Sequence, residues 1–170
     1  MTVAGRVAAE LVQGLAGRGL TLAVAESLTG GLVTAAVVEV PGASTVLRGG
    51  VVAYATELKH ELLGVDSALL AEHGPIHPQV AAMMAAGVRE RCGADIGVAT
   101  TGVAGPEGQD GHSAGEVYIA VVIAGRSEER GLLLSGERDA VREAATIAAL
   151  NLVIEVAGLS RASTSPGVPG

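Results

Sequence analysis

The sequence predicts an α/β fold in which a mixed β-sheet carries helices on both faces. Short apolar runs with strand character alternate with segments of helical periodicity, glycine-bearing turns separate them, and two strand-like runs follow each other late in the chain. Alternating strands and helices are typical of a parallel sheet covered by helices, and a late hairpin adds antiparallel strands. With 170 residues the chain is expected to form one domain over residues 1–159.

The expected strands share short apolar runs that are bounded by turn residues. They cover residues 20–25, 47–54, 96–101, 116–124 and 130–135. The fourth and fifth are joined at Gly125 and Arg126, so they are expected to form a hairpin.

The expected helices share apolar residues at helical spacing or clear start and stop signals. They cover residues 4–18, 32–40, 56–63, 66–73, 79–91 and 137–156. Gly19 ends the first helix, Thr56 is a candidate N-cap of the third, and Pro78 fits the first position of the fifth. Residues 160–170 are rich in Ser, Gly and Pro, and they are predicted to be a disordered tail.

Composition excludes several classes of partner. Apolar residues make up 49% of the chain, and Tyr54 and Tyr118 are its only aromatic residues, so an aliphatic core is expected. The net charge of −7 argues against nucleic acid as a partner, because such binding needs a basic surface. Cys92 is the single cysteine, which excludes a disulfide framework and fits a reduced, cytoplasmic setting. No apolar run reaches the ~18 residues of a membrane span, so no membrane partner is expected.

The chain contains a single lysine, Lys59. Every other residue among its 11 lysines and arginines is an arginine. Lys59 is expected one turn into the helix that follows the second strand. A lysine acts as a general base when burial or its neighbours lower its pKa, whereas an arginine cannot take this role. The alternative is a solvated helix lysine that pairs with Glu57 or Glu61.

The first of three polar or glycine-rich loops that follow predicted strands contains Ser27. Because ligands bind beyond the carboxyl ends of the strands in an open α/β sheet, the loops at residues 26–31, 54–59 and 101–111 are expected to converge. The amides around Thr29, Gly30 and Gly31 begin a helix and could hold an anion or an oxyanion. A Ser27–Lys59 pair would be an activated nucleophile, and a helix N-cap serine is the alternative.

The third loop offers Thr101, Gly102 and Gly105, whose backbone amides could hold a phosphate or a sugar. The loop matches neither the P-loop nor the GxGxxG motif, and a mobile surface loop is the alternative. Arg138 and Arg142 lie four residues apart on one face of the last helix and fit a phosphate between them. Solvated ion pairs with Asp139 or Glu143 are the alternative for these two arginines.

Metal-ligand spacing is not convincing anywhere in the chain. His73 and His77 are four residues apart, but Gly74 and Pro75 prevent the shared helix that this spacing requires. No metal site is expected.

Five segments in order resemble the C-terminal domain of the CinA (competence/damage-inducible) proteins. They are ESLTGG at residues 26–31, GGVVAY at 49–54 with Lys59, LLGV at 62–65, TGVAGP at 101–106 and GERDAVR at 136–142. The resemblance covers roughly residues 5–157. Free-standing members of this family are nicotinamide-nucleotide amidases, which hydrolyse the carboxamide of nicotinamide mononucleotide to the carboxylate and release ammonia.

The resemblance implies Ser27 as the nucleophile, Lys59 as its base and Tyr54 in the same constellation. It implies a three-layer α/β/α fold with a mixed, mostly parallel five-stranded sheet, and neither a metal nor an organic cofactor. A small-molecule pyridine nucleotide is the implied substrate. For such a substrate we expect the backbone amides near Thr29–Gly31 to hold the oxyanion, and Arg142, Arg138 or the Gly102–Gly105 loop to bind the phosphate. Full-length relatives carry an N-terminal pyrophosphatase-like domain, and that activity is expected to be absent from this chain.

Three departures from the family pattern stand out. Leu28 occupies a position that is usually Cys, residues 74–77 differ from the family's GAVS, and residues 112–116 lack the lysine of its KPVGT segment. The last change affects the expected substrate affinity more than the chemistry.

Two other functions remain open, and an oligomer is expected. The first alternative is a nucleotide-binding or regulatory module that keeps the pocket without turnover. The second is a DNA-processing role, which the charge of −7 disfavours. Aliphatic surface and abundant small residues favour a homo-oligomer, a dimer or larger.

Overall fold

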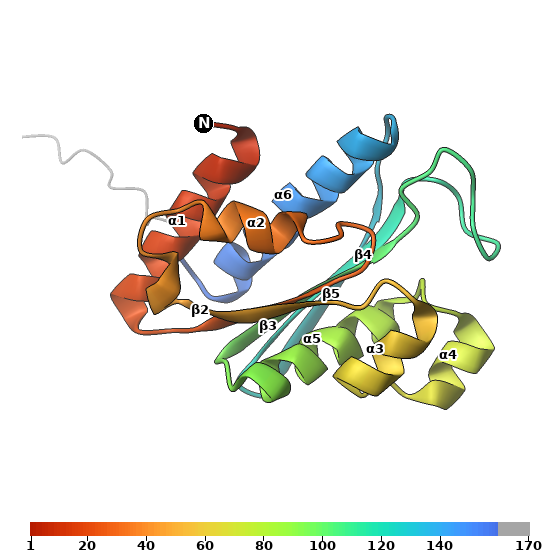
Figure 1. The fold of residues 1–170 in the computed structure, drawn as a ribbon, viewed down its shortest axis with the longest axis horizontal. Coiled ribbons are helices and arrows are strands. Elements are labelled where there is room, and N and C mark those ends of the chain that lie inside the picture. The colour runs from red at the N-terminus through yellow and green to blue at the C-terminus, as the bar shows by residue number, and fades with distance from the viewer. Residues whose placement is uncertain (160–170) are drawn as a thin grey trace, which may run out of the picture.

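A five-stranded sheet between two layers of helices forms the structure, a computed structural model that describes residues 1–159 (Figure 1). The strands are β1 (Leu22–Glu26), β2 (Leu47–Val52), β3 (Ile96–Gly102), β4 (Glu116–Ile123) and β5 (Arg126–Leu133). The helices are α1 (Val3–Arg18), α2 (Leu32–Val38), α3 (Thr56–Leu63), α4 (Ser67–His73), α5 (Pro78–Cys92) and α6 (Arg138–Val156), with a 3-10 turn at Ala43–Thr45. The predicted disordered tail, residues 160–170, lies outside the described residues.

The sheet has the strand order β2-β1-β3-β4-β5. β1 pairs in parallel with β2 and β3, whereas β4 runs antiparallel to both β3 and β5. All strands except β4 therefore point the same way, which confirms the predicted mixed, mostly parallel sheet. Glu26, the last residue of β1, is in register with Val52 and Thr100. The chain segments that leave β1, β2 and β3 consequently emerge at one edge of the sheet.

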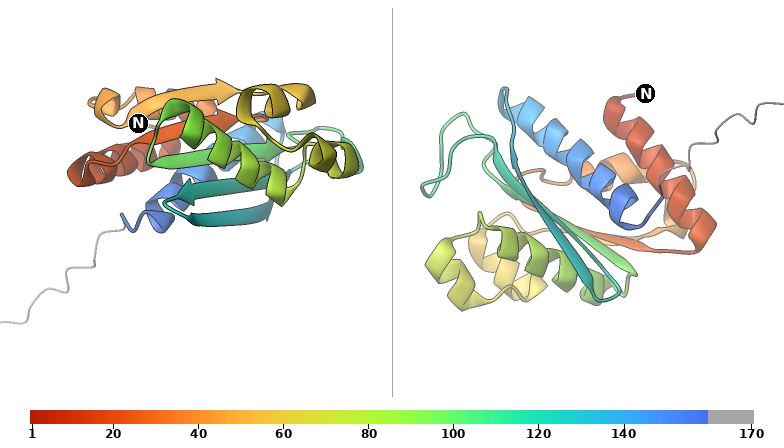
Figure 2. Two further views of the ribbon diagram at one scale, coloured as in Figure 1. Left: turned by 90° about the horizontal axis from the view of Figure 1, so that it is seen from below. Right: turned by 180° about the vertical axis from the view of Figure 1, so that it is seen from behind.

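Side chains alternate along the strands and divide the interior into two aliphatic cores. Leu22 and Val24 of β1 belong to the core under α1, α2 and α6, and α1 and α6 lie side by side in Figure 2. Ala23 and Ala25 belong to the core under α3, α4 and α5. Every residue of β1 is buried, as expected for a parallel strand covered on both faces.

A glycine lets α5 pack closely against α3, within the helical layer formed by α3, α4 and α5. A Cβ added to Gly87 of α5 would lie 1.8 Å from the carbonyl oxygen of Leu63, the last residue of α3. Gly87 thus permits the contact between α5 and α3, the helix that carries Lys59.

Replacing Gly87 with alanine is expected to lower the free energy of unfolding by about 1–3 kcal/mol, because the new methyl group must displace α3 from α5. Chemical denaturation measures the change. Gly17→Ala is the matched control, since a Cβ at Gly17 of α1 would meet nothing within 4 Å, and it is expected to stabilise by up to about 1 kcal/mol. Equal stabilities of Gly87→Ala and the wild type would show that the helix contact is not tight.

Two local predictions are wrong. β5 begins at Arg126 rather than at residue 130, because Ala124 and Gly125 form the turn with positive φ angles of 35° and 77°. The early part of β5 is polar and exposed at the edge of the sheet, so it lacks the apolar alternation that indicates a strand. Thr56 is the first helical residue of α3 rather than its cap, and Ala55 precedes it without a side-chain hydrogen bond.

The helices of the described part of the chain can be compared with the length and apolar character of a membrane span. None of the helices within residues 1–159 combines the length and the apolar character needed to cross a bilayer.

Candidate active site

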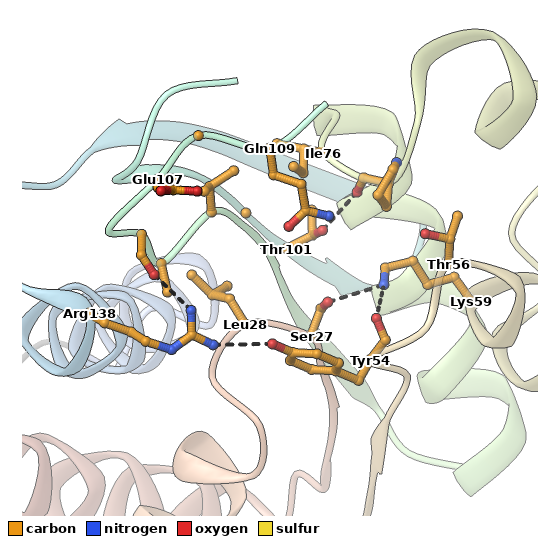
Figure 3. A pocket seen from close by; sticks show the side chains of 16 residues that line it. Ser27, Leu28, Tyr54, Thr56, Lys59, Ile76, Thr101, Glu107, Gln109 and Arg138 are labelled. Atoms are coloured by element: carbon orange, nitrogen blue, oxygen red, sulfur yellow. Dashed lines mark hydrogen bonds between the residues drawn. The ribbon is translucent and has the colours of Figure 1, made fainter. Parts of the chain in front are cut away.

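The loops that follow β1, β2 and β3 converge on a pocket of about 220 Å³, as the sheet topology predicts (Figure 3). Its lining combines a serine, a lysine, a tyrosine and an arginine with glycine-rich backbone. The lining residues are Ser27, Leu28, Tyr54, Thr56, Lys59, Pro75, Ile76, Thr101, Gly102, Val103, Ala104, Gly105, Glu107, Gly108, Gln109 and Arg138.

Ser27 and Lys59 are buried residues of the pocket lining and lie next to each other. Ser27 follows β1 directly, and its N–H donates to the carbonyl of Thr100 at 3.1 Å, which extends the pairing of β1 with β3 by one residue. Lys59 lies one turn into α3, and its Nζ donates to Ser27 Oγ at 3.1 Å. The fold therefore places the predicted nucleophile and the predicted base within hydrogen-bond distance.

Burial alters the acid–base properties of Lys59, which is only 1% exposed. Its Nζ also donates to the carbonyl oxygens of Ala53 at 2.8 Å and Tyr54 at 3.4 Å. Desolvation lowers the pKa of Lys59 to about 8, although the charge of Glu57 acts to raise this pKa. Within residues 1–159 Lys59 forms no ion pair with Glu57 or Glu61. The alternative of a solvated lysine therefore does not apply.

Tyr54 and Arg138 are exposed residues of the pocket lining. Arg138, the first residue of α6, donates from Nη1 to the carbonyl of Gly105 at 2.8 Å and from Nη2 to the hydroxyl of Tyr54 at 3.2 Å. Tyr54 is 60% exposed, so its ring is accessible to a ligand. Figure 3 shows the Arg138 side chain reaching toward Tyr54 and the Gly105 loop. Arg138 and Lys59 are the two cationic side chains that line the pocket.

The glycine-rich loop after β3 forms one wall. The hydroxyl of Thr101 donates to the carbonyl of Pro75 at 2.7 Å, which ties the loop to the connection between α4 and α5. A Cβ on Gly102 would lie 2.5 Å from the carbonyl oxygen of Glu116, so this close approach requires glycine. The N–H groups of Ala104 and Gly105, two residues that line the pocket, have no acceptor among residues 1–159.

Four of the predicted substrate-binding residues do not line the pocket: Thr29, Gly30, Gly31 and Arg142. The N–H of Gly30 donates to the carbonyl of Ser27 at 3.0 Å, and the hydroxyls of Thr29 and Thr100 bond at 2.8 Å. Arg142 donates from Nε to the Leu28 carbonyl at 2.9 Å and from Nη2 to the Thr29 carbonyl at 3.0 Å. The Gly30 N–H, the Gly31 N–H (which donates to Glu26) and the Arg142 guanidinium are thus engaged within the protein, whereas the Thr29 N–H has no acceptor within residues 1–159. Contacts of these four residues with substrate stay predictions from the sequence.

Glu26 explains why the start of α2 does not serve as an anion site. This carboxylate is fully buried and accepts hydrogen bonds from the N–H groups of Gly31 at 3.0 Å, Val33 at 3.1 Å and Thr34 at 2.8 Å, and from the Thr34 hydroxyl at 2.7 Å. A carboxylate is stabilised at a helix N-terminus by these amides and by the helix dipole. The protein itself thus supplies the anion, and the predicted oxyanion donors Gly30 and Gly31 are occupied.

The N–H of Leu28 is a free donor beside Ser27. It has no acceptor in the described chain, and Leu28 lines the pocket. The residue after a nucleophile commonly supplies an oxyanion donor when the nucleophile lies on a strand-to-helix turn. Sequence reasoning missed both Glu26 and the Leu28 amide. A charged residue at the end of an apolar strand was the available signal for Glu26.

Six further pocket residues were not singled out from the sequence as site residues. Thr56, Glu107, Gly108 and Gln109 lie in the loops that were expected to converge, whereas Pro75 and Ile76 come from the connection between α4 and α5, for which no site was predicted. His73 and His77 end α4 and precede α5, and their rings stack with centroids 4.5 Å apart. Residues 1–159 contain no group of three or more His, Cys, Asp or Glu side chains placed to hold a metal ion.

Comparison with known proteins gives consistent matches. A family model described as the CinA C-terminal domain matches residues 4–157. A CinA-like protein from Frankia casuarinae is 47% identical over 89% of this chain and 36% of its own length. A CinA-like protein from Geobacter sulfurreducens is 44% identical over 79% of this chain and 33% of its own length. The chain thus spans about a third of the curated relatives that it matches.

Solved structures agree with the fold. A competence or damage-inducible protein from Enterobacter asburiae has a TM-score of 0.88 and 35% identity over 94% of this chain and 100% of its own. A competence-damaged protein (CinA) superfamily protein from Escherichia coli has a TM-score of 0.88 and 31% identity over 91% of this chain and 90% of its own. The α/β/α architecture is therefore shared with these proteins.

Proposed function

The chain belongs to the family of CinA C-terminal domains, and from this premise we propose that it is an amidase that hydrolyses nicotinamide mononucleotide to nicotinate mononucleotide and ammonia. The observation that carries the proposal is the buried Lys59 amine, which lies 3.1 Å from the Ser27 hydroxyl in a pocket at the carboxyl ends of the strands. An amine with a lowered pKa beside a hydroxyl is an activated-nucleophile arrangement.

The first half of the reaction forms an acyl-enzyme. Neutral Lys59 removes the proton from Ser27 Oγ, and this oxygen attacks the carboxamide carbon. The Leu28 N–H then donates to the oxyanion, and such a donor is worth about 3 kcal/mol in the transition state. Protonated Lys59 returns the proton to the departing nitrogen, which leaves as ammonia. The carbonyls of Ala53 and Tyr54 stabilise the ammonium form between these steps.

The second half of the reaction releases the acid. Lys59, neutral again, removes a proton from water, and the resulting hydroxide attacks the ester carbon. Collapse of the second tetrahedral intermediate returns the proton to Ser27 Oγ. No step requires a group other than the chain's own residues and water.

Other residues of the pocket lining suit the rest of the nucleotide. Arg138 is a cation that lines the pocket, and the unpaired N–H groups of Ala104 and Gly105 are neighbouring donors, so together they can bind a phosphate. The accessible ring of Tyr54 can stack on the positively charged pyridinium ring.

Ammonia release from nicotinamide mononucleotide, from nicotinamide riboside and from free nicotinamide tests the proposal. The mononucleotide is expected to be the best substrate, because it alone carries the phosphate. Release from none of the three, combined with a nucleotide-dependent rise in melting temperature, would favour a binding or regulatory module instead. A homo-oligomer and a cytoplasmic location remain predictions from the sequence.

The pH dependence of the reaction follows from the lowered pKa of Lys59. Only the neutral amine accepts the Ser27 proton, so kcat/KM is expected to rise by about tenfold per pH unit below the pKa. The rise should level off above the pKa of about 8. Initial rates of ammonia release between pH 6 and 9.5 measure the profile. A profile that is flat, or that falls as the pH rises from 6 to 8, would contradict a lysine base.

A further inference from the structure

Two charged side chains of opposite sign hold the segment Ser27–Gly31, here called the nucleophile turn. The Arg142 guanidinium holds its carbonyl oxygens at Leu28 and Thr29, at 2.9 and 3.0 Å. The buried Glu26 carboxylate holds the Gly31 amide and the amides of Val33 and Thr34 in the first turn of α2. Hydrogen bonds with an ionised partner are roughly twice as strong as neutral ones.

The nucleophile turn needs such restraint because its backbone is intrinsically flexible. Gly30 and Gly31 have φ angles of 58° and 105°, in the region that glycine adopts without strain. Neither residue offers a side chain that could fix the conformation. The position of Ser27 relative to Lys59 therefore depends on groups outside the turn.

Peptide planarity connects these contacts to the candidate oxyanion donor. In a trans peptide the carbonyl of one residue and the N–H of the next point in opposite directions. The Ser27 carbonyl accepts from the Gly30 N–H at 3.0 Å, so the Leu28 N–H points away from the interior of the turn. Arg142 holds the next two carbonyls and so prevents these peptide units from rotating.

The position of Arg142 distinguishes it from Arg138. Arg142 does not line the pocket, and within residues 1–159 it forms no ion pair. A Cβ at Gly30 would lie 3.4 Å from Arg142 Nη2, so the guanidinium lies against the outside of the turn. Arg142 would have to break two hydrogen bonds to carbonyls before it could reach a ligand.

We propose that Arg142 is a positioning residue that, with Glu26, keeps Ser27 Oγ facing Lys59 and the Leu28 N–H facing the pocket, whereas Arg138 is the one of the two arginines that binds the phosphate. This inference rests on the proposed function and specifies the role of each arginine in it. Arg138 and Arg142 lie one turn apart on the same face of α6, an arrangement that suggests a shared phosphate site. The proposal instead gives the two arginines different roles.

Steady-state kinetics with Arg142→Gln, Arg138→Gln and the matched control Glu143→Gln test this division. The control changes an exposed neighbour of Arg142 on α6. Arg142→Gln is expected to lower kcat by about 10- to 100-fold for both the mononucleotide and the riboside, with KM changed by less than about threefold. Arg138→Gln is expected to raise KM for the mononucleotide by about tenfold or more, and to affect the riboside much less. Arg142→Lys should recover part of the lost kcat, because an ammonium group can still donate to a carbonyl.

Two results would overturn the proposal. A rise in KM for the mononucleotide in Arg142→Gln, with kinetics on the riboside unchanged, would make Arg142 a phosphate ligand. A lower melting temperature with an unchanged kcat would make it a purely structural residue. Circular dichroism of each variant confirms that folded protein is compared.

Labelling with a fluorophosphonate tests the positioning role of Arg142 independently of the proposed substrate. The reagent phosphonylates activated serines, with loss of fluoride, without regard to the natural substrate, and peptide mass spectrometry locates the modified residue. If the wild type releases no ammonia but labels at Ser27, slower labelling of Arg142→Gln by about tenfold or more supports positioning, and equal rates refute it. If wild-type Ser27 does not label, both the positioning role and the proposed function fail.

Discussion

Replacing Ser27 with alanine is expected to reduce ammonia release from nicotinamide mononucleotide by at least about 1,000-fold, because no other group can form the acyl-enzyme. The only other hydroxyls lining the pocket are those of Tyr54, Thr56 and Thr101, and the Thr101 hydroxyl donates to Pro75. Continuous measurement of ammonia with purified protein checks the result. The rate that remains in Ser27→Ala should be the rate that the oxyanion donor and substrate binding support without the nucleophile.

The Ser27→Ala variant is expected to keep its fold, since the substitution removes a single oxygen atom whose recorded partner is Lys59 Nζ. Ser44→Ala, at an exposed serine in the 3-10 turn, is the matched control and should have wild-type turnover. Wild-type turnover in Ser27→Ala would refute the assignment of the nucleophile. Binding of the mononucleotide to this variant, measured by calorimetry, should persist.

Lys59→Arg is expected to reduce kcat/KM by about 100- to 10,000-fold, the range that a general base typically contributes. The substitution keeps the positive charge but removes any accessible neutral state, because a guanidinium does not lose its proton in proteins. At 1% exposure the site also leaves little room for the larger head group. The same ammonia assay, repeated up to pH 9.5, measures the loss.

The pH dependence of the variant adds a second criterion. The rise in rate toward pH 8 should disappear in Lys59→Arg, because the group that loses its proton in this range is gone. Glu61→Gln, at an exposed position two residues further along α3, is the control and should retain both rate and profile. Full activity in Lys59→Arg would exclude a lysine base.

The pairing of Ser27 with Lys59 could be predicted from the sequence for a physical reason. Each residue follows a predicted strand, and the carboxyl ends of adjacent parallel strands meet at one edge of a sheet. Chemical type and topology together were therefore enough to bring two residues 32 positions apart into one site. The aliphatic composition and the strand–helix alternation likewise sufficed for the layers of the fold.

The roles of Arg142 and of the Gly30 and Gly31 amides could not be predicted in the same way. Whether these groups can bind a ligand depends on whether other groups of the protein already form hydrogen bonds with them. Those hydrogen bonds join segments that are far apart in the sequence. Glu26 illustrates the difficulty, because its carboxylate turns back onto the amides of the helix that follows it. Spacing in the sequence places Arg138 and Arg142 on one helix face but does not show which of them faces the pocket.

The start of β5 was missed for a different reason. Ser127, Glu128 and Glu129 form strand ladder contacts with β4, yet their side chains are polar because the strand lies at the edge of the sheet. Alternation of apolar and polar residues indicates that one face of a strand is buried, and it does not indicate backbone pairing. A strand that faces solvent therefore lacks this pattern.

The burial of Lys59 has a consequence for the stability of the fold. The Lys59 amine has a pKa of about 8 in the folded protein, against an ordinary lysine pKa of 10.5, so the unfolded chain binds the proton more tightly between these values. Stability from this group therefore increases as the pH rises from 8 to 10.5, and below pH 8 the folded state bears the full cost, on the order of 3 kcal/mol. An apolar residue would escape that cost. The same burial that would make Lys59 the proposed general base therefore lowers the free energy of unfolding at neutral pH.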